Sequence, residues 1–436
     1  MRFVDLIEKK RDGHSLATDE INWFIESVTA GTAPDYQVSA LLMAIVIRGM
    51  SRRETVDLTL AMADSGDRLD LSDVVPFAVD KHSSGGVGDK TTLVVLPVVA
   101  ACGVPVAKMS GRGLGSSGGT LDKMESIRGW SPDVPLDRFR AQVADIGLVL
   151  AGQTAKLAPA DGILYALRDV TGTVPSTPLI AGSIMSKKLA AGADGIVLDV
   201  KVGSGAFMHT VAEARELAEI MVNIGHDAGR QTVAVLSDMN QPLGVAIGNT
   251  LEVQEAIETM NGGGPADFLA HCRKIAGHML VLAGKYPSVE AAQAAIDTAL
   301  NDGSALAKFR AMVVAQGGDG ELIDQPEKLT RAAIIRPVTA SRDGYIGAMD
   351  TGRIGWSAVH LGAGRLTKSD PINHAVGMMM PVKIGDKIGA GQPLAEIHAA
   401  DEASWAQAAA ELTAAISIVD EPVAPLPHFY GTIESG

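Results

Sequence analysis

The spacing of hydrophobic positions changes along the chain. Over about the first 65 residues, apolar side chains recur every three or four positions, which predicts amphipathic helices. One such stripe comprises Ile21, Phe24, Ile25 and Val28. Thr18 is the expected N-cap of that helix, and Ser51 with Glu54 has the spacing of a capping box. We therefore expect the chain to begin with a helical domain.

From residue 74 the pattern becomes a short apolar run, a glycine-rich loop and then a helical stretch. The runs that predict strands are 74–79, 104–109, 195–200 and 231–236. This alternation predicts a mainly parallel sheet, with ligands beyond the carboxyl ends of its strands. Residues 160–192 resume helical spacing, and we expect them to return to the first domain.

After about residue 335 the chain shows short apolar segments separated by glycine. YIGAM, AVHLGAG and VKIGDKIGAGQPLAEIHA read as strands with tight turns. The stretch 377–388, GMMMPVKIGDKI, faintly resembles a biotinyl or lipoyl hammerhead. The modified lysine would lie in the turn, where Met378, Met379 and Met380 stand, so we expect a structural module.

These patterns predict an α/β protein in three parts. The expected parts are a small all-helical domain (1–66 with 160–192), a large α/β domain with a mainly parallel sheet (74–155 with 195–335), and a C-terminal α+β, hammerhead-like module (336–436).

Composition narrows the function classes. Over 436 residues the formal charge is −14, which argues against a general nucleic-acid binder, since few phosphate counterions would be released. The two cysteines, Cys102 and Cys272, exclude a disulfide scaffold. We find neither a signal-peptide core nor a run of about 18 apolar residues, so we expect a soluble cytoplasmic protein.

Four aspartates stand at three-residue intervals between the helical and strand-rich parts: Asp64, Asp67, Asp70 and Asp73. Their spacing matches no calcium loop, so a solvated acidic linker is the preferred interpretation, with a metal site as the alternative. Glycine is in excess, at 48 residues, about 11% against a usual level of about 7%. That excess indicates close backbone approaches, either to a ligand or between packed elements.

Two glycine-rich loops have an anion-binding composition. The first is KHSSGGVGD, residues 81–89, in which Lys81 adds a full charge to the exposed N–H groups. The second, SGRGLGSSGGT at 110–120, adds several hydroxyls. A packing turn is the alternative for each, but two such loops in one sheet favour a shared phosphate. His82 is a candidate acid near neutral pH.

A second group of residues suits a planar ligand rich in carbonyl groups. Ser183 and Lys187 are four positions apart in a predicted helix and share a face, while Arg168 lies on a neighbouring helical segment. Together they form a cationic fork with a hydroxyl. Taken alone, these side chains are more typical of a charged surface than of a ligand site.

Five motifs in order resemble the thymidine and pyrimidine-nucleoside phosphorylases. They are KHSSGGVGD, SGRGLGSSGGTLDKMES, GQTAKLAPADGILYALRDVTGTV, SIMSKKLAAGADGIVLDVKVGSGAFM and SDMNQPLG. The similarity runs from end to end. It implies a homodimer, no organic cofactor, and a cleft between domains where a pyrimidine nucleoside reacts with phosphate. The implied activity is that of a pentosyltransferase, yielding free base and pentose 1-phosphate.

The resemblance also implies roles for individual residues. The implied phosphate ligands are Lys81, Ser83, Thr92, Lys108, Ser110 and Thr120. The implied pyrimidine contacts are Arg168, Ser183 and Lys187, with His82 at O2 of the base. The residues implied around the base are Tyr165, Leu114, Ile184 and Phe207. Arg168, Lys187 and His82 would act on the leaving base.

The chain departs from the family pattern at three places. Ser116-Ser117 replaces a His-Thr pair in the second loop, and Ser84 replaces a threonine in the first. Lys90 stands where potassium-binding members have threonine. The other implied potassium ligands are retained: Gly88, Leu243, Ala246 and Glu255. Either the Lys90 ammonium replaces the ion and faces Glu255, or Lys90 points to solvent and potassium binds.

The leading interpretation is a pyrimidine-nucleoside phosphorylase that accepts uridine, thymidine and deoxyuridine. A thymidine-specific enzyme is the alternative. A phosphoribosyltransferase of similar architecture is more distant, because the loops carry no acidic cluster for magnesium and diphosphate. A non-catalytic binding protein is disfavoured because residues for phosphate and for base occur together.

Overall fold

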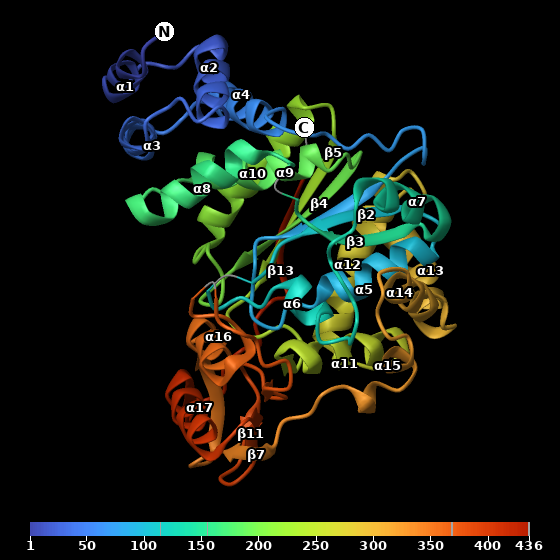
Figure 1. The fold of residues 1–436 in the computed structure, drawn as a ribbon. Coiled ribbons are helices and arrows are strands. Elements are labelled where there is room, and N and C mark those ends of the chain that lie inside the picture. Colours follow the sequence, from blue (N-terminus) through green and yellow to red (C-terminus); the bar gives the residue numbers. More distant parts are fainter. Residues whose placement is uncertain (114, 155, 368, 435–436) are drawn as a thin grey trace.

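A six-stranded sheet runs through the middle of the described chain (Figure 1). The computed structural model describes residues 1–113, 115–154, 156–367 and 369–434. The strands, in spatial order, are β13 (Phe429–Glu434), β5 (Gln231–Asp238), β4 (Gly195–Val202), β1 (Val79–Ser83), β2 (Val106–Ser110) and β3 (Leu148–Gly152). Strands β1 to β5 are parallel to one another, which confirms the predicted mainly parallel sheet.

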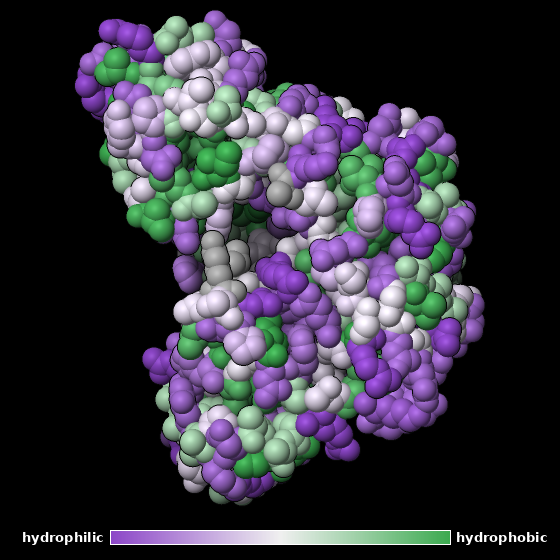
Figure 2. Space-filling model, viewed as in Figure 1, coloured by the Kyte–Doolittle hydropathy of each residue, from purple (hydrophilic) through white to green (hydrophobic). Residues whose placement is uncertain are grey.

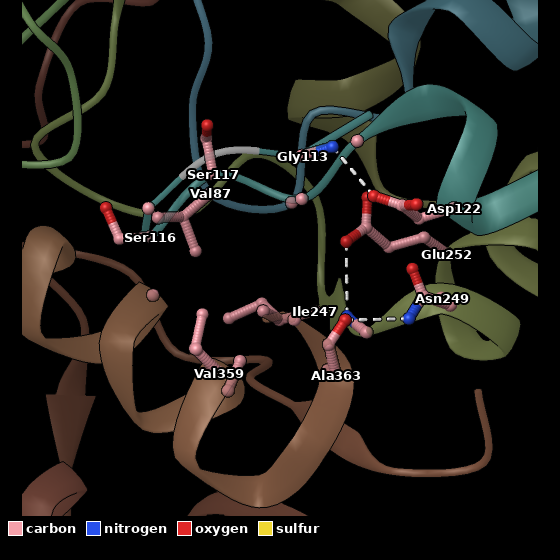
Figure 3. Close-up of a pocket in the computed structure, with 18 of the residues that line it drawn as sticks. Val87, Gly113, Ser116, Ser117, Asp122, Ile247, Asn249, Glu252, Val359 and Ala363 are labelled. Atoms are coloured by element: carbon pink, nitrogen blue, oxygen red, sulfur yellow. Dashed lines mark hydrogen bonds between the residues drawn. The ribbon is translucent and has the colours of Figure 1, made fainter. Parts of the chain in front are cut away.

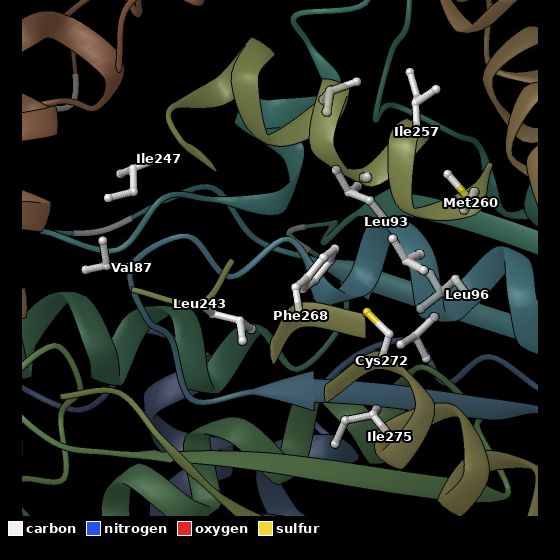
Figure 4. Close-up of a cluster of buried hydrophobic side chains, with 14 of the residues drawn as sticks. Val87, Leu93, Leu96, Leu243, Ile247, Ile257, Met260, Phe268, Cys272 and Ile275 are labelled. Atoms are coloured by element: carbon white, nitrogen blue, oxygen red, sulfur yellow. The ribbon is translucent and has the colours of Figure 1, made fainter. Parts of the chain in front are cut away.

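Helices cover both faces of this sheet. Contacts place α10 on β4 and β5, and α12 on β4 and β1. The helices of this part are α5 (Thr91–Ala101), α6 (Thr120–Met124), α7 (Leu136–Ile146), α10 (Val211–Asp227), α11 (Asn249–Met260), α12 (Ala266–Leu282), α13 (Val289–Asn301), α14 (Ser304–Ala315) and α15 (Glu321–Asp324), followed by a 3₁₀ turn at Pro326–Lys328. Helix α5 is buried on all sides, and its Leu93 and Leu96 face side chains of α11 and α12 (Figure 4).

The N-terminal part is helical, as predicted. It comprises α1 (Phe3–Arg11), α2 (Thr18–Thr29), α3 (Asp35–Arg48) and α4 (Arg52–Ala63). Ser51 and Glu54 form the expected capping box, since the Ser51 N–H donates to Glu54 at 2.9 Å and the Glu54 N–H donates to Ser51. Two later helices, α8 (Pro159–Thr171) and α9 (Thr177–Ala190), pack on this bundle and share its core through Leu164 and Leu179.

The C-terminal part contains two small sheets and a helix pair, shown in orange and red in Figure 1. One of the two sheets also includes the short strand β6 (Ala246–Ile247), which comes earlier in the chain. The elements of the C-terminal part itself are β7 (Ile334–Thr339), β8 (Gly344–Met349), α16 (Thr351–Ala358), β9 (Gly377–Met379), β10 (Lys387–Ile388), β11 (Pro393–Ala399), α17 (Glu402–Ala415) and β12 (Ile416–Val419). Each sheet is antiparallel in all its pairings.

Four local predictions are wrong. The N-cap of α2 is Ala17, and Thr18 is the first residue of the helix. AVHLGAG is not a strand but the end of α16 and a π-helical turn at Val359–Ala363, because Ile354, Ala358 and Leu361 are buried at helical spacing. The first strand starts only at Val79, after Pro76, and continues through Ser83. The last strand, β13, leaves the range 336–436 assigned to the C-terminal module and pairs antiparallel with β5.

Candidate functional site

A cavity of about 1040 Å³ lies beyond the carboxyl ends of β1 and β2, against α8 and α9. Figure 2 shows the molecule hollowed between its helical part and its C-terminal part. The predicted residues that line this cavity are His82, Ser83, Thr92, Lys108, Ser110, Thr120, Tyr165, Arg168, Ser183, Ile184, Lys187 and Phe207. Leu114 lies outside the described residues. The two sets of residues predicted for phosphate and for base therefore share one chamber.

Lys81 lies just behind the wall of this cavity. Its side chain is 1% exposed, and Nζ lies 3.6 Å from Asp199 Oδ2 and 3.9 Å from Asp89 Oδ1. The ammonium group has no hydrogen-bond partner among the described residues. A buried ammonium that is charge-balanced but not hydrogen-bonded retains its donors for an anionic ligand.

Asp199, which balances this charge, is fixed by three side chains. Its carboxylate accepts hydrogen bonds from Lys201 at 2.8 Å and Ser237 at 2.7 Å, and lies 2.8 Å from His271 Nε2. Burial alone would raise the pKa of Asp199, but its interactions with His271, Lys201 and Lys81 outweigh this effect and hold the pKa well below its usual value. Asp199 is therefore a carboxylate near neutral pH.

Lys108 projects from β2 into the same region. Its Nζ donates to the Lys81 carbonyl and lies 3.5 Å from Asp80 Oδ1. Burial lowers the pKa of Lys108 to about 7, and the neighbouring Lys188 and Lys81 add to this effect while Asp80 opposes it. Lys108 therefore changes its charge in the neutral pH range, and the charge on its side of the cavity changes with it.

The second loop is anchored to the C-terminal part of the chain. Figure 3 shows the Gly113 N–H donating to Asp122 at 2.7 Å. The same aspartate pairs with Arg365, which follows α16, at 3.0 Å. The Ser116 carbonyl lies against Gly355 of α16, where an added Cβ would approach it to 2.5 Å. Of the two departures from the family pattern in this loop, only Ser117 lines the large cavity.

Arg168 on α8 is held by main-chain acceptors. Its guanidinium donates to the carbonyls of Thr173 at 3.1 Å, Val174 at 2.8 Å and Leu179 at 3.1 Å. Three of its five N–H donors are thereby used and the plane of the group is fixed. The Tyr165 ring centroid lies 5.9 Å from Cζ. Arg168 therefore presents a fixed cation to the cavity.

Lys187 and Ser183 project from one face of α9, as their spacing predicted. Lys187 Nζ donates to Asp161 of α8 at 2.6 Å and to Ser183 Oγ at 3.0 Å. Because Ser183 only accepts in this contact, its hydroxyl can still donate one hydrogen bond. These side chains match a ligand edge that alternates acceptors and donors, such as that of a pyrimidine-2,4-dione.

His82 stands between these two groups of cations. Burial and the nearby Lys188 and Lys108 ammonium groups hold the pKa of His82 well below its usual value. In the ligand-free protein the imidazole is therefore neutral near pH 7. This favours a hydrogen-bond donor over the proton-donating acid that the sequence left open.

The Lys90 side chain is buried among the residues implied for potassium. Its Nζ lies 2.5 Å from Glu255 Oε1 and donates to the carbonyls of Leu243 and Ala246, both at 3.0 Å. The alternative in which Lys90 points to solvent is wrong, since its side chain is 0% exposed. Because the ammonium uses these oxygens itself, the residues present do not fit a potassium ion as well.

Family models match three stretches of the chain. The glycosyl transferase family a/b domain matches residues 76–306, the helical bundle domain of that family matches 4–66, and the pyrimidine nucleoside phosphorylase C-terminal domain matches 345–419. Pyrimidine-nucleoside phosphorylase of Geobacillus stearothermophilus is 54% identical over 398 residues, 91% of this chain and 92% of the relative. The chain belongs to the pyrimidine-nucleoside phosphorylase family.

Other members of the pyrimidine-nucleoside phosphorylase family match along almost the whole chain. The enzyme of that name from Staphylococcus aureus strain MSSA476 is 52% identical over 425 residues, 98% of each chain. Among solved structures, anthranilate phosphoribosyltransferase from Thermus thermophilus has a TM-score of 0.59 at 21% identity, covering 72% of this chain and 99% of that one. This last likeness concerns the fold alone.

Sequence reasoning missed several residues of this phosphorylase-family site. Asp161 holds Lys187, Asp80 lies beside Lys108, and Lys188 lines the cavity. Lys188 could have been found, because it follows Lys187 directly in the motif SIMSKK. The other two are single acidic residues whose role depends on which helix or strand they face, a property that sequence spacing does not carry.

Proposed function

We propose that the protein catalyses phosphorolysis of pyrimidine nucleosides, giving free base and pentose 1-phosphate. The supporting observation is one cavity lined by Arg168, Ser183 and Lys187 from the helices and by parts of both glycine-rich loops. The relatives that match over nearly the whole chain carry the name of this activity.

The chemistry explains why cations stand on both sides of the cavity. A phosphate oxygen attacks C1′ of the sugar on the face opposite the base, the bond from C1′ to the base nitrogen breaks, and its electron pair leaves with the base. Arg168 and Lys187 would stabilise the negative charge that grows on the base. Lys81, Lys108 and the hydroxyls of Ser83, Ser110, Thr92 and Thr120 would hold the phosphate in position.

His82 would donate a hydrogen bond to O2 of the departing base. A neutral imidazole donates one N–H and needs no proton transfer to do so. The departing anion then takes up the proton that the attacking hydrogen phosphate carried, directly or through water, which leaves neutral base and pentose 1-phosphate. Exclusion of bulk water during the reaction protects the sugar cation from hydrolysis.

We propose a broad substrate range: uridine, thymidine and deoxyuridine, with thymidine specificity as the alternative. The test incubates the protein with each nucleoside, with and without phosphate, and measures free base together with pentose 1-phosphate. We expect base release from all three only when phosphate is present. Release without phosphate would overturn the phosphorylase proposal, and release from thymidine alone would establish the narrower range.

We also propose that this phosphorylase needs no potassium, because Lys90 supplies the positive charge beside Glu255. Turnover in potassium-free buffer should equal turnover after addition of the ion. The variant Lys90→Thr opens the site and should gain a dependence on potassium. A severalfold stimulation of the wild-type protein by potassium would contradict the proposal.

The assembly that we propose is a homodimer in the cytoplasm. The helical part exposes Tyr36, Ile47 and Val170, which are 74%, 70% and 77% accessible, and we propose that the partner covers them. Cys102 and Cys272 are both free thiols. No described helix is long and apolar enough to span a membrane. Sedimentation analysis tests the dimer.

A further inference from the structure

Two consecutive lysines on α9 reach in different directions. Lys187 contacts Asp161 and Ser183, which belong to the helical part of the molecule. Lys188 instead reaches the sheet, where its Nζ donates to Asp80 Oδ2 at 2.8 Å and to the Met109 carbonyl at 2.9 Å. Lys188 is 3% exposed and lines the cavity. One helix therefore carries a base-side cation and, at the next residue, a link to the phosphate side.

Asp80 is the point at which this link meets the phosphate-side lysines. Its side chain is 0% exposed, and Oδ1 accepts from the Lys81 N–H at 2.6 Å while lying 3.5 Å from Lys108 Nζ. The second contact of Lys188, the Met109 carbonyl, directly precedes Ser110 on β2. Lys188 thus touches both strands that carry the implied phosphate ligands.

The contacts of Lys188 are costly to rearrange. A buried ammonium must keep its carboxylate and carbonyl partners, because an unpaired buried charge is strongly unfavourable. Lys188, and with it α9, can therefore move relative to Asp80 only over short distances without breaking these contacts. Lys187, one residue earlier on the same helix, shares this constraint.

We propose that Lys188 is a positioning residue: by joining α9 to Asp80 and Met109, it sets the distance between the base-binding and phosphate-binding halves of the cavity. This inference rests on the proposed function, since the distance matters only if ligands in the two halves react with each other. Displacement by phosphate requires the attacking oxygen and C1′ to be aligned. A misplacement of about 1 Å can cost roughly a hundredfold in rate.

The test separates positioning from charge and from stability. Lys188→Met removes the ammonium but keeps a long side chain, and Asp80 retains Lys108 and the Lys81 N–H. Lys188→Arg keeps a charged donor, and Lys285→Met, at an exposed lysine outside the cavity lining, is the control. For each protein we would measure kcat at saturating substrates, and the Kd of uracil and of sulfate by calorimetry.

We expect Lys188→Met to lower kcat by roughly a hundredfold while each single ligand still binds. Lys188→Arg should lose less, and Lys285→Met should match the wild type. In a double-mutant cycle with Asp80→Asn, the losses in kcat should not add, because both changes break one contact. Unchanged kcat with weaker sulfate binding would make Lys188 a simple anion ligand and overturn the proposal. A lower Tm with unchanged constants would also overturn it.

A readout without turnover keeps this inference separate from the proposed function. Uracil affinity is measured with and without sulfate, and the ratio gives the coupling between the two halves. A wild-type protein that cleaves no nucleoside would overturn the phosphorylase proposal alone. Loss of the coupling in Lys188→Met would still support the role of Lys188, whereas equal coupling in both proteins would overturn it.

Discussion

Lys90 and Glu255 form an ion pair that solvent does not reach, with Nζ and Oε1 2.5 Å apart and side chains 0% and 3% exposed. Lys90 immediately precedes α5, at the end of the first glycine-rich loop, while Glu255 lies on α11. Glu255 also accepts hydrogen bonds from the Val245 and Ala246 N–H groups. The pair therefore connects the loop behind the phosphate-side residues to the segment around residue 245.

Removal of Lys90 should destabilise the protein strongly. In Lys90→Met the Glu255 carboxylate stays buried without its cation, which costs about 3–5 kcal/mol. The matched control is Lys328→Met, which breaks an exposed pair with Glu321 and should leave the free energy of unfolding nearly unchanged. Denaturant unfolding of both variants in potassium-free buffer measures the difference. Equal losses of stability in the two variants would show that burial of the Lys90–Glu255 pair does not make it more stabilising than the exposed pair.

A substitution at Gly244 should also disturb the Lys90–Glu255 ion pair. It has φ +68°, and a Cβ there would lie 2.1 Å from Glu255 Oε1 and 2.8 Å from Lys90 Nζ. Gly244→Ala should therefore displace the ion pair in addition to straining the backbone. Gly229→Ala is the control, because Gly229 has φ +72° with nothing within 4 Å and incurs only the backbone cost, about 1–2 kcal/mol. Gly244→Ala should therefore lower the free energy of unfolding more than Gly229→Ala does, and the difference should exceed the backbone cost of about 1–2 kcal/mol.

The sequence predicted much of the sheet because several parallel strands carry a local signal, although β3 was not predicted. Short apolar runs before glycine-rich loops located β2, β4 and β5 closely, whereas the run at 74–79 ends at the first residue of β1. The edge strand β13 has no such local signal. Its partner β5 ends 191 positions before Phe429 begins the strand (429 minus 238), and pairing at that distance depends on the folded sheet.

The site shows the same division between local and distant information. Lys187 and Ser183 were placed together because four positions on a helix define one face. The partners Asp161, Asp80 and Asp199 were not found, since each comes from a separate element. What the sequence lacked was the set of acids that face Lys81, Lys108 and Lys187.

Lys187 should be essential to the chemical step. Loss of a donor that stabilises developing negative charge typically costs about 3–4 kcal/mol, a factor of roughly 10²–10³ in rate. We expect that loss in kcat/KM for uridine with Lys187→Ala, measured below the unfolding temperature of the variant. Lys285→Ala, at an exposed lysine outside the cavity lining, serves as the control. An unchanged rate would refute the role of Lys187.

Anion binding should weaken as the pH rises through about 7, the pKa to which burial brings Lys108. Below that pH Lys108 is charged and attracts the anion, and above it the ligand-free site loses a positive charge, so binding must take up a proton. Sulfate is the preferred probe because its charge stays constant across the neutral range, unlike that of phosphate. His82 does not interfere, since its pKa lies well below 6.5. Calorimetry in buffers of different ionisation enthalpy should detect proton uptake above pH 7 in the wild type and none in Lys108→Met. Equal uptake in both proteins would assign the titration to another group.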